Sequence, residues 1–458
     1  MAATRWGVWL AIVAGWTSSV CGQDLAAVTR PGAHIQRTMR LLEESTPAKR
    51  NTVRVLFYGQ SITAGKWSQM TADEMRKRWP NANLQIENRA IGGFTAPSLI
   101  LTSEYDLYPN YPDLLIFHVY DNPGMATFDE IIRRVRLRTT AEILLATHHD
   151  VGREKDYEAS KLIRQIAIKY DCGLVDIERQ WQETMAKEGR TIKDYLGDGV
   201  HHNAEGAELY SRLINAFLVR DPSLPSERAA GWIEDIAADD ARLVKRLPDG
   251  SLEVAFSGNR IDVLAGAATP AGPLADVLVD GRSPSSFPEG YTPTRPSPAP
   301  FIWMPAFKVL GHEKPLLVED WTLRVLESTP DGKQFRFRVS GSITGDDGEG
   351  TNKERFVSKS GRVVIDPTNG NWMVAWSLEY RSKKKPVQMP EGFEVKWQVV
   401  PRFADRLEFP AAKTAGVEKA VTLIQGIANG PHTLRLAPVA GAHLKLQGFR
   451  VYRPPLAR

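Results

Sequence analysis

Two short segments, far apart in the chain, contain residue types that together can cleave an ester. Ser61 follows an apolar run, residues 53–58, through a turn of small and polar residues. Much later, Asp198 stands three residues before His201, at the start of an expected helix. Serine catalysis needs a base to take the hydroxyl proton and a carboxylate to orient the imidazole. The two segments therefore predict a triad of Ser61, His201 and Asp198.

This pairing resembles the GDSL-type esterases, the SGNH hydrolase family, over roughly residues 50–220. The family's Gly-Asp-Ser turn reads Gly59-Gln60-Ser61 here, and its terminal Asp-x-x-His corresponds to Asp198 and His201. Gln60 replaces the Asp of that turn, and we expect its side chain to be structural. The resemblance implies a flavodoxin-like, three-layer α/β domain with a parallel sheet, an esterase activity and no cofactor.

The resemblance also implies an oxyanion hole, formed by the backbone N–H of Ser61 and of Gly92 or Gly93. The family's third block, Gly-x-Asn-Asp, is altered here, because Tyr120 stands where the Asn is expected. Residues two apart on a strand share a face, so Asn122 can replace that amide. The Tyr120 hydroxyl, or backbone groups alone, are the alternatives; we favour Asn122.

Further histidines lie beside these blocks. His149 ends the fourth expected strand, and His202 follows the catalytic base, on the expected rim of the site. With Tyr120, we expect these two to contact substrate. Adjacent histidines on an extended chain point to opposite faces, and no histidine pair has the helical i, i+4 spacing. The sequence therefore predicts no metal site.

The elements that must position these residues alternate between strand and helix. Short apolar runs separated by amphipathic stretches indicate a parallel sheet with helices on both faces, with sites at the carboxyl ends of the strands. The expected strands are 53–58, 84–87, 114–119, 142–147 and 173–176. The expected helices include 70–79, 128–138, 157–169 and one that begins near residue 204, capped by Asn203.

A second part of the chain has a different pattern. Residues 226–246 have apolar side chains at helical spacing and predict a docked linker helix. Beyond residue 250, runs such as 252–256, 334–339 and 393–399 alternate with period two between turn clusters, including 346–350. This pattern predicts an all-β sandwich, jelly-roll-like and a candidate for carbohydrate binding. Trp303, in a Pro-rich loop, is the residue best placed to stack on a sugar ring.

Composition and length bound the protein class. The chain has 458 residues, of which 42% are hydrophobic and 24% charged, as in a globular protein of several domains. Its net charge is only +4, and the sequence has no basic stripe of the kind that binds nucleic acid.

Residues 1–22 resemble a secretory signal peptide, and their apolar run is too short to span a membrane. Lipidation at Cys21 is the alternative. Export would leave Cys172 alone, without an intramolecular disulfide; we expect it to be a small buried group.

The expected domains are therefore a signal peptide (1–22), a hydrolase domain (23–220), a linker helix (221–250) and a β-sandwich (251–458). The leading hypothesis is a secreted or periplasmic serine esterase that removes acyl groups, acetyl above all, from an oligo- or polysaccharide. One alternative is a catalytically inactive carbohydrate-binding or cell-surface protein. The other is a lipid or aryl esterase, which should have a broad apolar cleft.

Overall fold

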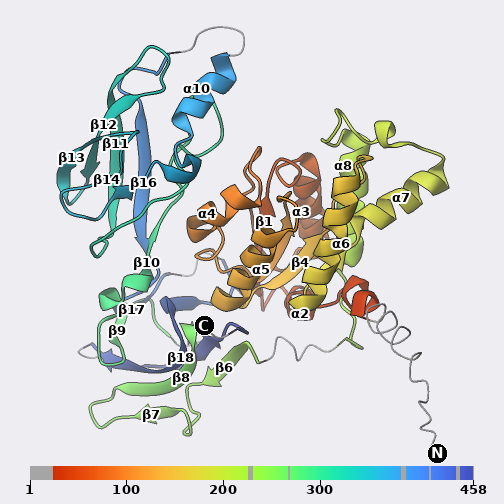
Figure 1. The fold of residues 1–458 in the computed structure, drawn as a ribbon. Coiled ribbons are helices and arrows are strands. Elements are labelled where there is room, and N and C mark those ends of the chain that lie inside the picture. Colours follow the sequence, from red (N-terminus) through yellow and green to blue (C-terminus); the bar gives the residue numbers. More distant parts are fainter. Residues whose placement is uncertain are drawn as a thin grey trace, which may run out of the picture.

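We describe the protein from a computed structural model, which places residues 24–224, 231–266, 269–382, 388–411, 414–439 and 444–456. The expected signal peptide, with Cys21, lies outside these ranges. The described residues form an α/β unit followed by two large antiparallel sheets (Figure 1). No helix in this described part is long and apolar enough to cross a membrane.

The α/β unit contains the expected five-stranded sheet, and all of its strands are parallel. In the order β2-β1-β3-β4-β5, the neighbours of β1 lie on either side of it, so the connections run in opposite directions from this point. Ligands of such sheets bind where the strand order reverses, at the carboxyl ends. The strands are β1 (Thr52–Gly59), β2 (Asn83–Asn88), β3 (Leu114–His118), β4 (Glu142–Ala146) and β5 (Gly173–Val175).

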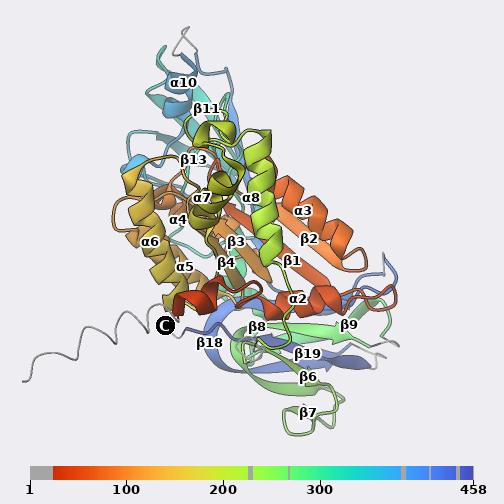
Figure 2. The same ribbon diagram turned by 90° about the vertical axis from the view of Figure 1, so that its right-hand side faces the viewer.

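Helices cover both faces of this sheet (Figure 2). Alternate residues of β1 divide between two cores: Leu56 and Tyr58 pack with α4, α5 and α6, whereas Val55 and Phe57 pack with α2, α3, α7 and α8. This is the three-layer α/β arrangement expected from the sequence. The helices are α2 (Gln36–Glu43), α3 (Lys66–Arg78), α4 (Ala96–Asp106), α5 (Ala126–Arg138), α6 (Glu154–Lys169), α7 (Ile177–Glu188) and α8 (Ala204–Phe217).

The C-terminal part contains two separate antiparallel sheets (Figure 1). One has the order β10-β16-β11-β12-β13, and helix α10 (Val374–Ser382) and the small pair β14 (Phe356–Val357) and β15 (Val364–Ile365) accompany it. Its strands are β10 (Tyr291–Pro293), β11 (Glu319–Ser328), β12 (Phe335–Gly341), β13 (Gly345–Thr351) and β16 (Glu394–Pro401).

The second sheet has the order β17-β9-β18-β8-β19-β6, with β7 paired to β8, and its own hydrophobic core. The chain segments of the first sheet are inserted between β9 and β17 of the second. The strands are β6 (Ile233–Ala237), β7 (Val244–Arg246), β8 (Leu252–Ala265), β9 (Gly272–Val279), β17 (Arg406–Phe409), β18 (Ala420–Pro438) and β19 (Leu446–Tyr452).

Two sequence predictions for this part are wrong. The segment 226–246, expected to be a linker helix, contributes strands β6 and β7 over its described residues, because Ile236 and Val244 bury into the core of the second sheet. The cluster 346–350, expected to be a turn, lies in β13, where Glu349 pairs with arginines of β12. Cross-strand pairing offsets the low strand propensity of the Asp and Gly residues there.

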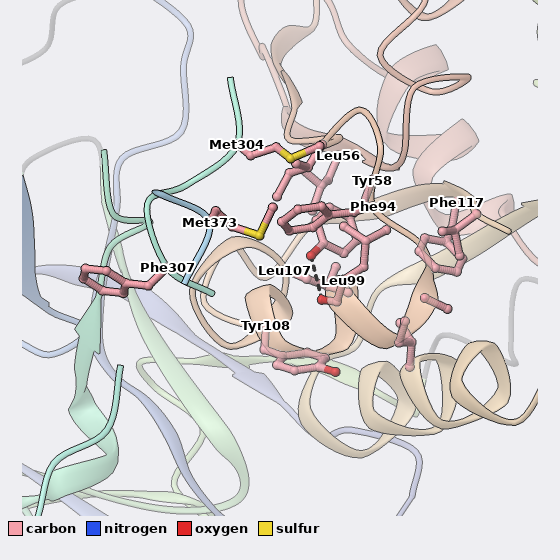
Figure 3. Packing of buried hydrophobic residues seen from close by; sticks show 14 of the residues in the cluster. Leu56, Tyr58, Phe94, Leu99, Leu107, Tyr108, Phe117, Met304, Phe307 and Met373 are labelled. Atoms are coloured by element: carbon pink, nitrogen blue, oxygen red, sulfur yellow. Dashed lines mark hydrogen bonds between the residues drawn. The ribbon is translucent and has the colours of Figure 1, made fainter. Parts of the chain in front are cut away.

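The first antiparallel sheet shares its core with the α/β unit. Met304 and Met373 reach toward Phe94 and Tyr58 of the α/β unit (Figure 3), and all four are buried in one continuous cluster. An ion pair strengthens this contact: the guanidinium of Arg295 donates to both carboxylate oxygens of Asp106, which is 1% exposed. The two parts therefore depend on each other for burial of their apolar surface.

Candidate active site

The nucleophile candidate, Ser61, lies directly beyond the carboxyl end of the central strand β1. The turn begins at Gly59, where a side chain has no room, since a Cβ there would lie 2.0 Å from the carbonyl oxygen of His118. The chain can therefore leave the sheet closely packed against β3 and present Ser61 at the edge. This is the position where the strand order reverses.

The base and carboxylate candidates come from the loop before α8. Asn203 caps this helix as expected, accepting the backbone N–H of Gly206 over 2.9 Å. Asp198 accepts the backbone N–H groups of Val200 and His201, each over 2.7 Å, and the Nδ1–H of His201 over 2.8 Å. These hydrogen bonds, the backbone bond from His201 first, hold the pKa of Asp198 well below its usual range. Asp198 is therefore an ionised partner that fixes the ring of His201.

The structure brings the three residues together in the predicted order. His201 Nε2 lies 3.0 Å from Ser61 Oγ, and its Nδ1 faces Asp198. Because the neutral ring carries its proton on Nδ1, Nε2 presents a lone pair to the serine hydroxyl. The side chains of His201 and Asp198 are 51% and 59% exposed. This geometry allows His201 to accept the proton of Ser61 at an edge that substrate can reach.

The expected oxyanion donors surround the nucleophile. Ile91 is fixed by a backbone hydrogen bond to Gly59, and a Cβ on Gly92 would lie 3.6 Å from that of Ser61. Gly93 has φ +84°, which other residues rarely adopt. The backbone N–H groups of Ser61, Gly92 and Gly93 donate to no other described residue. They are available to a ligand oxygen.

The altered third block lies outside any strand, because β3 ends at His118. The prediction that alternation puts Tyr120 and Asn122 on one face is therefore wrong. Asn122 is exposed, whereas the Tyr120 hydroxyl is buried and unpartnered among the described residues. A backbone hydrogen bond from Ala96 to Tyr120 ties this block to the loop that contains Gly92. Of the two groups, the Asn122 side chain is the one exposed to solvent.

Four further histidines gather beneath His201. His118 and His148 share a hydrogen bond of 2.9 Å, while the rings of His149 and His202 lie 4.3 Å apart. Burial lowers the pKa of each, to about 3 for His148, about 4 for His149 and about 2 for His202, so the cluster is neutral. No group in the described part of the chain could hold a metal ion.

This cluster corrects the expected substrate contacts. His149 is fully buried, and its Nε2 lies 2.8 Å from the carbonyl oxygen of Val200, the residue before His201. His202 packs against Trp181 and Tyr210 instead of lining the rim. Tyr120 stacks on His148. The three side chains therefore pack within an interior cluster of rings: Tyr120 follows β3, His149 follows β4, and His202 lies in the loop before α8.

The sequence did not predict the contacts that two residues make at this site. The indole N–H of Trp303 donates to the carbonyl oxygen of Gly92 over 2.8 Å, although its side chain is 57% exposed. The Gln60 side chain, expected to be structural, lies 2.7 Å from Ser61 Oγ. The position of Trp303 in a Pro-rich loop indicated that its ring could be exposed. No feature of the sequence indicated that it contacts the α/β unit. Cys172, by contrast, is buried as predicted.

Comparisons with known proteins find similar structures among esterases. No protein-family model matches the sequence, and no curated protein matches it significantly. One similar solved structure is a two-domain esterase (CEX) active on acetylated mannans, co-crystallised with mannopentaose; identity is 13%, coverage 93% of this chain and 97% of that one, and the TM-score 0.36.

Two smaller structures are also similar. For Axe2, an acetylxylan esterase from Geobacillus stearothermophilus, identity is 18%, coverage 40% of this chain and 100% of that one, and the TM-score 0.33. For a putative GDSL-like lipase from Parabacteroides merdae, identity is 15%, coverage is 38% of this chain and 100% of that one, and the TM-score is 0.34. The similar solved structures thus include two esterases and a putative GDSL-like lipase, and the two-domain esterase matches this chain along nearly its whole length.

Proposed function

We propose that this protein is a serine esterase that removes short acyl groups, acetyl above all, from a carbohydrate. The observation that carries the proposal is the continuous relay from Ser61 Oγ to His201 Nε2, 3.0 Å, and from His201 Nδ1 to Asp198, 2.8 Å. A buried structural role would not require these three groups at an exposed edge. The same constellation performs acyl transfer on unrelated folds.

The proposed reaction has two halves. Ser61 Oγ attacks the ester carbonyl carbon while its proton passes to His201 Nε2, and the backbone N–H groups of Ser61 and the Gly92 loop stabilise the resulting oxyanion. His201 then gives the proton to the leaving sugar oxygen, which frees the alcohol and leaves an acyl-serine. Water, deprotonated by His201, attacks the acyl-serine and releases the carboxylic acid. Asp198 orients the ring and balances its charge throughout.

The surroundings of Ser61 support a short acyl group on a polar alcohol. Met304 presses on Gly93, where a Cβ would lie 2.4 Å from the methionine's methyl group, and Trp303 covers the Gly92 carbonyl. This crowding suits acetyl better than a long acyl chain. The exposed base and the exposed indole suit a hydrated sugar, whose ring can stack on the indole.

Hydrolysis of p-nitrophenyl acetate by the wild type and by Ser61→Ala tests the esterase, and acetate release from acetylated xylan and mannan oligosaccharides tests the substrate class. We expect turnover of both by the wild type alone. No turnover by the wild type would favour the inactive binding protein. Turnover of long-chain aryl esters in preference to acetylated oligosaccharides would favour the lipid or aryl esterase.

We also propose that residues 1–22 direct export, which would bring the enzyme to polymeric substrates outside the cytoplasm. Expression of the full chain in a secreting host, followed by N-terminal sequencing, tests this. A mature protein that begins near residue 23 supports export, whereas an intact Met1 in the cytoplasmic fraction contradicts it. A lipid-modified N-terminal Cys21 would establish the alternative signal.

A further inference from the structure

Gln60 precedes the nucleophile and is in contact with its reacting atom. The residue is 4% exposed, and its Oε1 lies 2.7 Å from Ser61 Oγ. Its Nε2 is buried and finds no hydrogen-bond partner among the described residues. The side-chain amide is therefore held against the serine by one atom only, while its two strong donors have no acceptor.

The protons of the triad determine which amide atom must face the serine. His201 Nδ1 donates to Asp198, so in the neutral ring Nε2 is an acceptor, and the hydroxyl of Ser61 must donate to it. A hydroxyl has a single proton. Ser61 Oγ then has only lone pairs to offer Gln60, and a carbonyl oxygen facing them would be repelled. A hydrogen bond between the two residues consequently requires an N–H of Gln60 as the donor.

The burial of the amide favours the same arrangement. A half-turn about the last side-chain bond exchanges Oε1 and Nε2 with little movement of other atoms, since the two halves of an amide have nearly the same shape. After the turn, Nε2 donates to Ser61 Oγ, and the atom without a partner is a carbonyl oxygen. Unpaired buried acceptors are less costly than unpaired donors.

We propose, on the basis of the esterase function above, that Gln60 is a catalytic residue whose Nε2–H donates to Ser61 Oγ. As Oγ attacks the carbonyl carbon and its proton moves to His201 Nε2, the Gln60 hydrogen bond stabilises the negative charge that develops on Oγ. In the second half, the bond between Oγ and the acyl carbon breaks, and Gln60 stabilises the departing Oγ until His201 returns the proton. Gln60 keeps its own proton throughout.

Gln60→Met tests the hydrogen bond, because Met has a similar size and no N–H. We expect kcat for p-nitrophenyl acetate to fall about 10- to 100-fold, the scale of one hydrogen bond to a charged group, with KM nearly unchanged. Gln36→Met is the matched control. Gln36 is also buried, but it bonds the carbonyls of Gly32 and Val219 at the amino end of the sheet. The control should keep wild-type kcat.

Gln60→Glu supplies a readout that a structural role would not change. When the introduced carboxyl group is ionised it can only accept, so it competes with His201 for the Ser61 proton and repels charge on Oγ. When it is protonated it can donate as the amide does. We therefore expect Gln60→Glu to lose activity with rising pH, through ionisation of the buried carboxyl, over a range in which wild-type activity does not fall.

The outcomes separate this proposal from the proposed function. If the wild type turns over the ester and Gln60→Met stays within twofold of it, or if the pH profile of Gln60→Glu parallels that of the wild type, Gln60 has no catalytic role. If the wild type hydrolyses no ester, the labelling rate of Ser61 by a fluorophosphonate compares the same variants: slower labelling of Gln60→Met supports the donor, and equal labelling of the two, or none, overturns it.

Discussion

Trp303, from the C-terminal part, donates its indole N–H to the carbonyl oxygen of Gly92, whose α-carbon lies beside Ser61. The C-terminal part thus contributes to the environment of the nucleophile. The core shared by the two parts and the Arg295–Asp106 ion pair hold the loop that contains Trp303 against the α/β unit. The surface beside Ser61 is therefore built from both parts of the chain.

Trp303→Ala should reduce kcat/KM for acetylated oligosaccharides about fivefold, mainly through KM, because stacking on an exposed ring contributes on the order of 1 kcal/mol. The effect on p-nitrophenyl acetate should be smaller. Trp303→Phe retains a ring but not the N–H, so it separates stacking from the hydrogen bond to Gly92. Trp376→Ala, another exposed aromatic, is the control. Equal losses of kcat/KM in Trp303→Ala and Trp376→Ala would mean that the effect is not specific to Trp303.

Ser61→Ala and His201→Ala should each lower kcat at least about 10³-fold, since members of such a triad act as a unit. Asp198→Ala should retain more activity because it orients the ring without exchanging a proton. Thermal midpoints of the first two should change little at this exposed edge. Ester hydrolysis with circular dichroism checks both statements. An active His201→Ala enzyme would refute the assignment of the base.

Asn122→Ala should lower kcat about 10²-fold if its amide donates to the oxyanion, the usual scale for one donor. Tyr120→Phe should have little effect on the rate, since the hydroxyl it removes is buried. Steady-state kinetics of both variants on one ester compares them directly. Wild-type rates in both would leave the backbone N–H groups as the sole donors, and a larger loss in Tyr120→Phe would reverse the assignment.

Arg295→Met should destabilise the protein by about 3 kcal/mol, because it leaves the buried carboxylate of Asp106 with Arg89, 3.7 Å away, as its remaining cationic partner. Arg336→Met, which breaks solvent-exposed pairs with Glu327 and Glu349, should destabilise the protein far less, because water and salt screen these charges. Denaturant unfolding measures both.

A fragment that ends near Arg246 should be insoluble, because it lacks the C-terminal residues of the core that the α/β unit shares with the first antiparallel sheet. A soluble, active fragment would show that the α/β unit is independent.

Acid should destabilise the protein through the buried histidines. Burial lowers the pKa of His202 to about 2, from an ordinary 6.5, so below pH 6.5 the unfolded chain takes up a proton that the folded chain does not. The free energy of unfolding should therefore fall as the pH drops from about 7 to about 4, by about 1.4 kcal/mol per unit for each such group.

His202→Phe should reduce this slope by about one proton, because Phe can fill the place between Trp181 and Tyr210 without titrating. Urea unfolding at several pH values measures the slope. At neutral pH and above, the variant should differ from the wild type only in packing. An unchanged slope would mean that His202 is protonated in the folded protein.

The parallel sheet and the placing of Ser61, His201 and Asp198 were accessible from sequence, because apolar runs and turn residues determine strands locally. Asn122 and Tyr120 were misjudged in orientation, since the end of β3 depends on pairing with β1 and β4. Strand β6 resembled a helix because Ile233 and Ile236 are three residues apart, a helical spacing, and it becomes a strand through its pairing with β19. The Trp303 contact depends on the packing of two distant segments, which no local pattern encodes.

The position of β19 in the seven-stranded sheet has a consequence for biosynthesis. β19 lies between β8 and β6. A ribosome therefore releases β6 and β8 long before the strand that joins them, and the edges that pair with β19 stay unpaired until residues 446–452 emerge. Premature termination even slightly upstream of residue 446 would leave two exposed strand edges, a template for aggregation. Completion of this sheet must therefore wait for synthesis of β19.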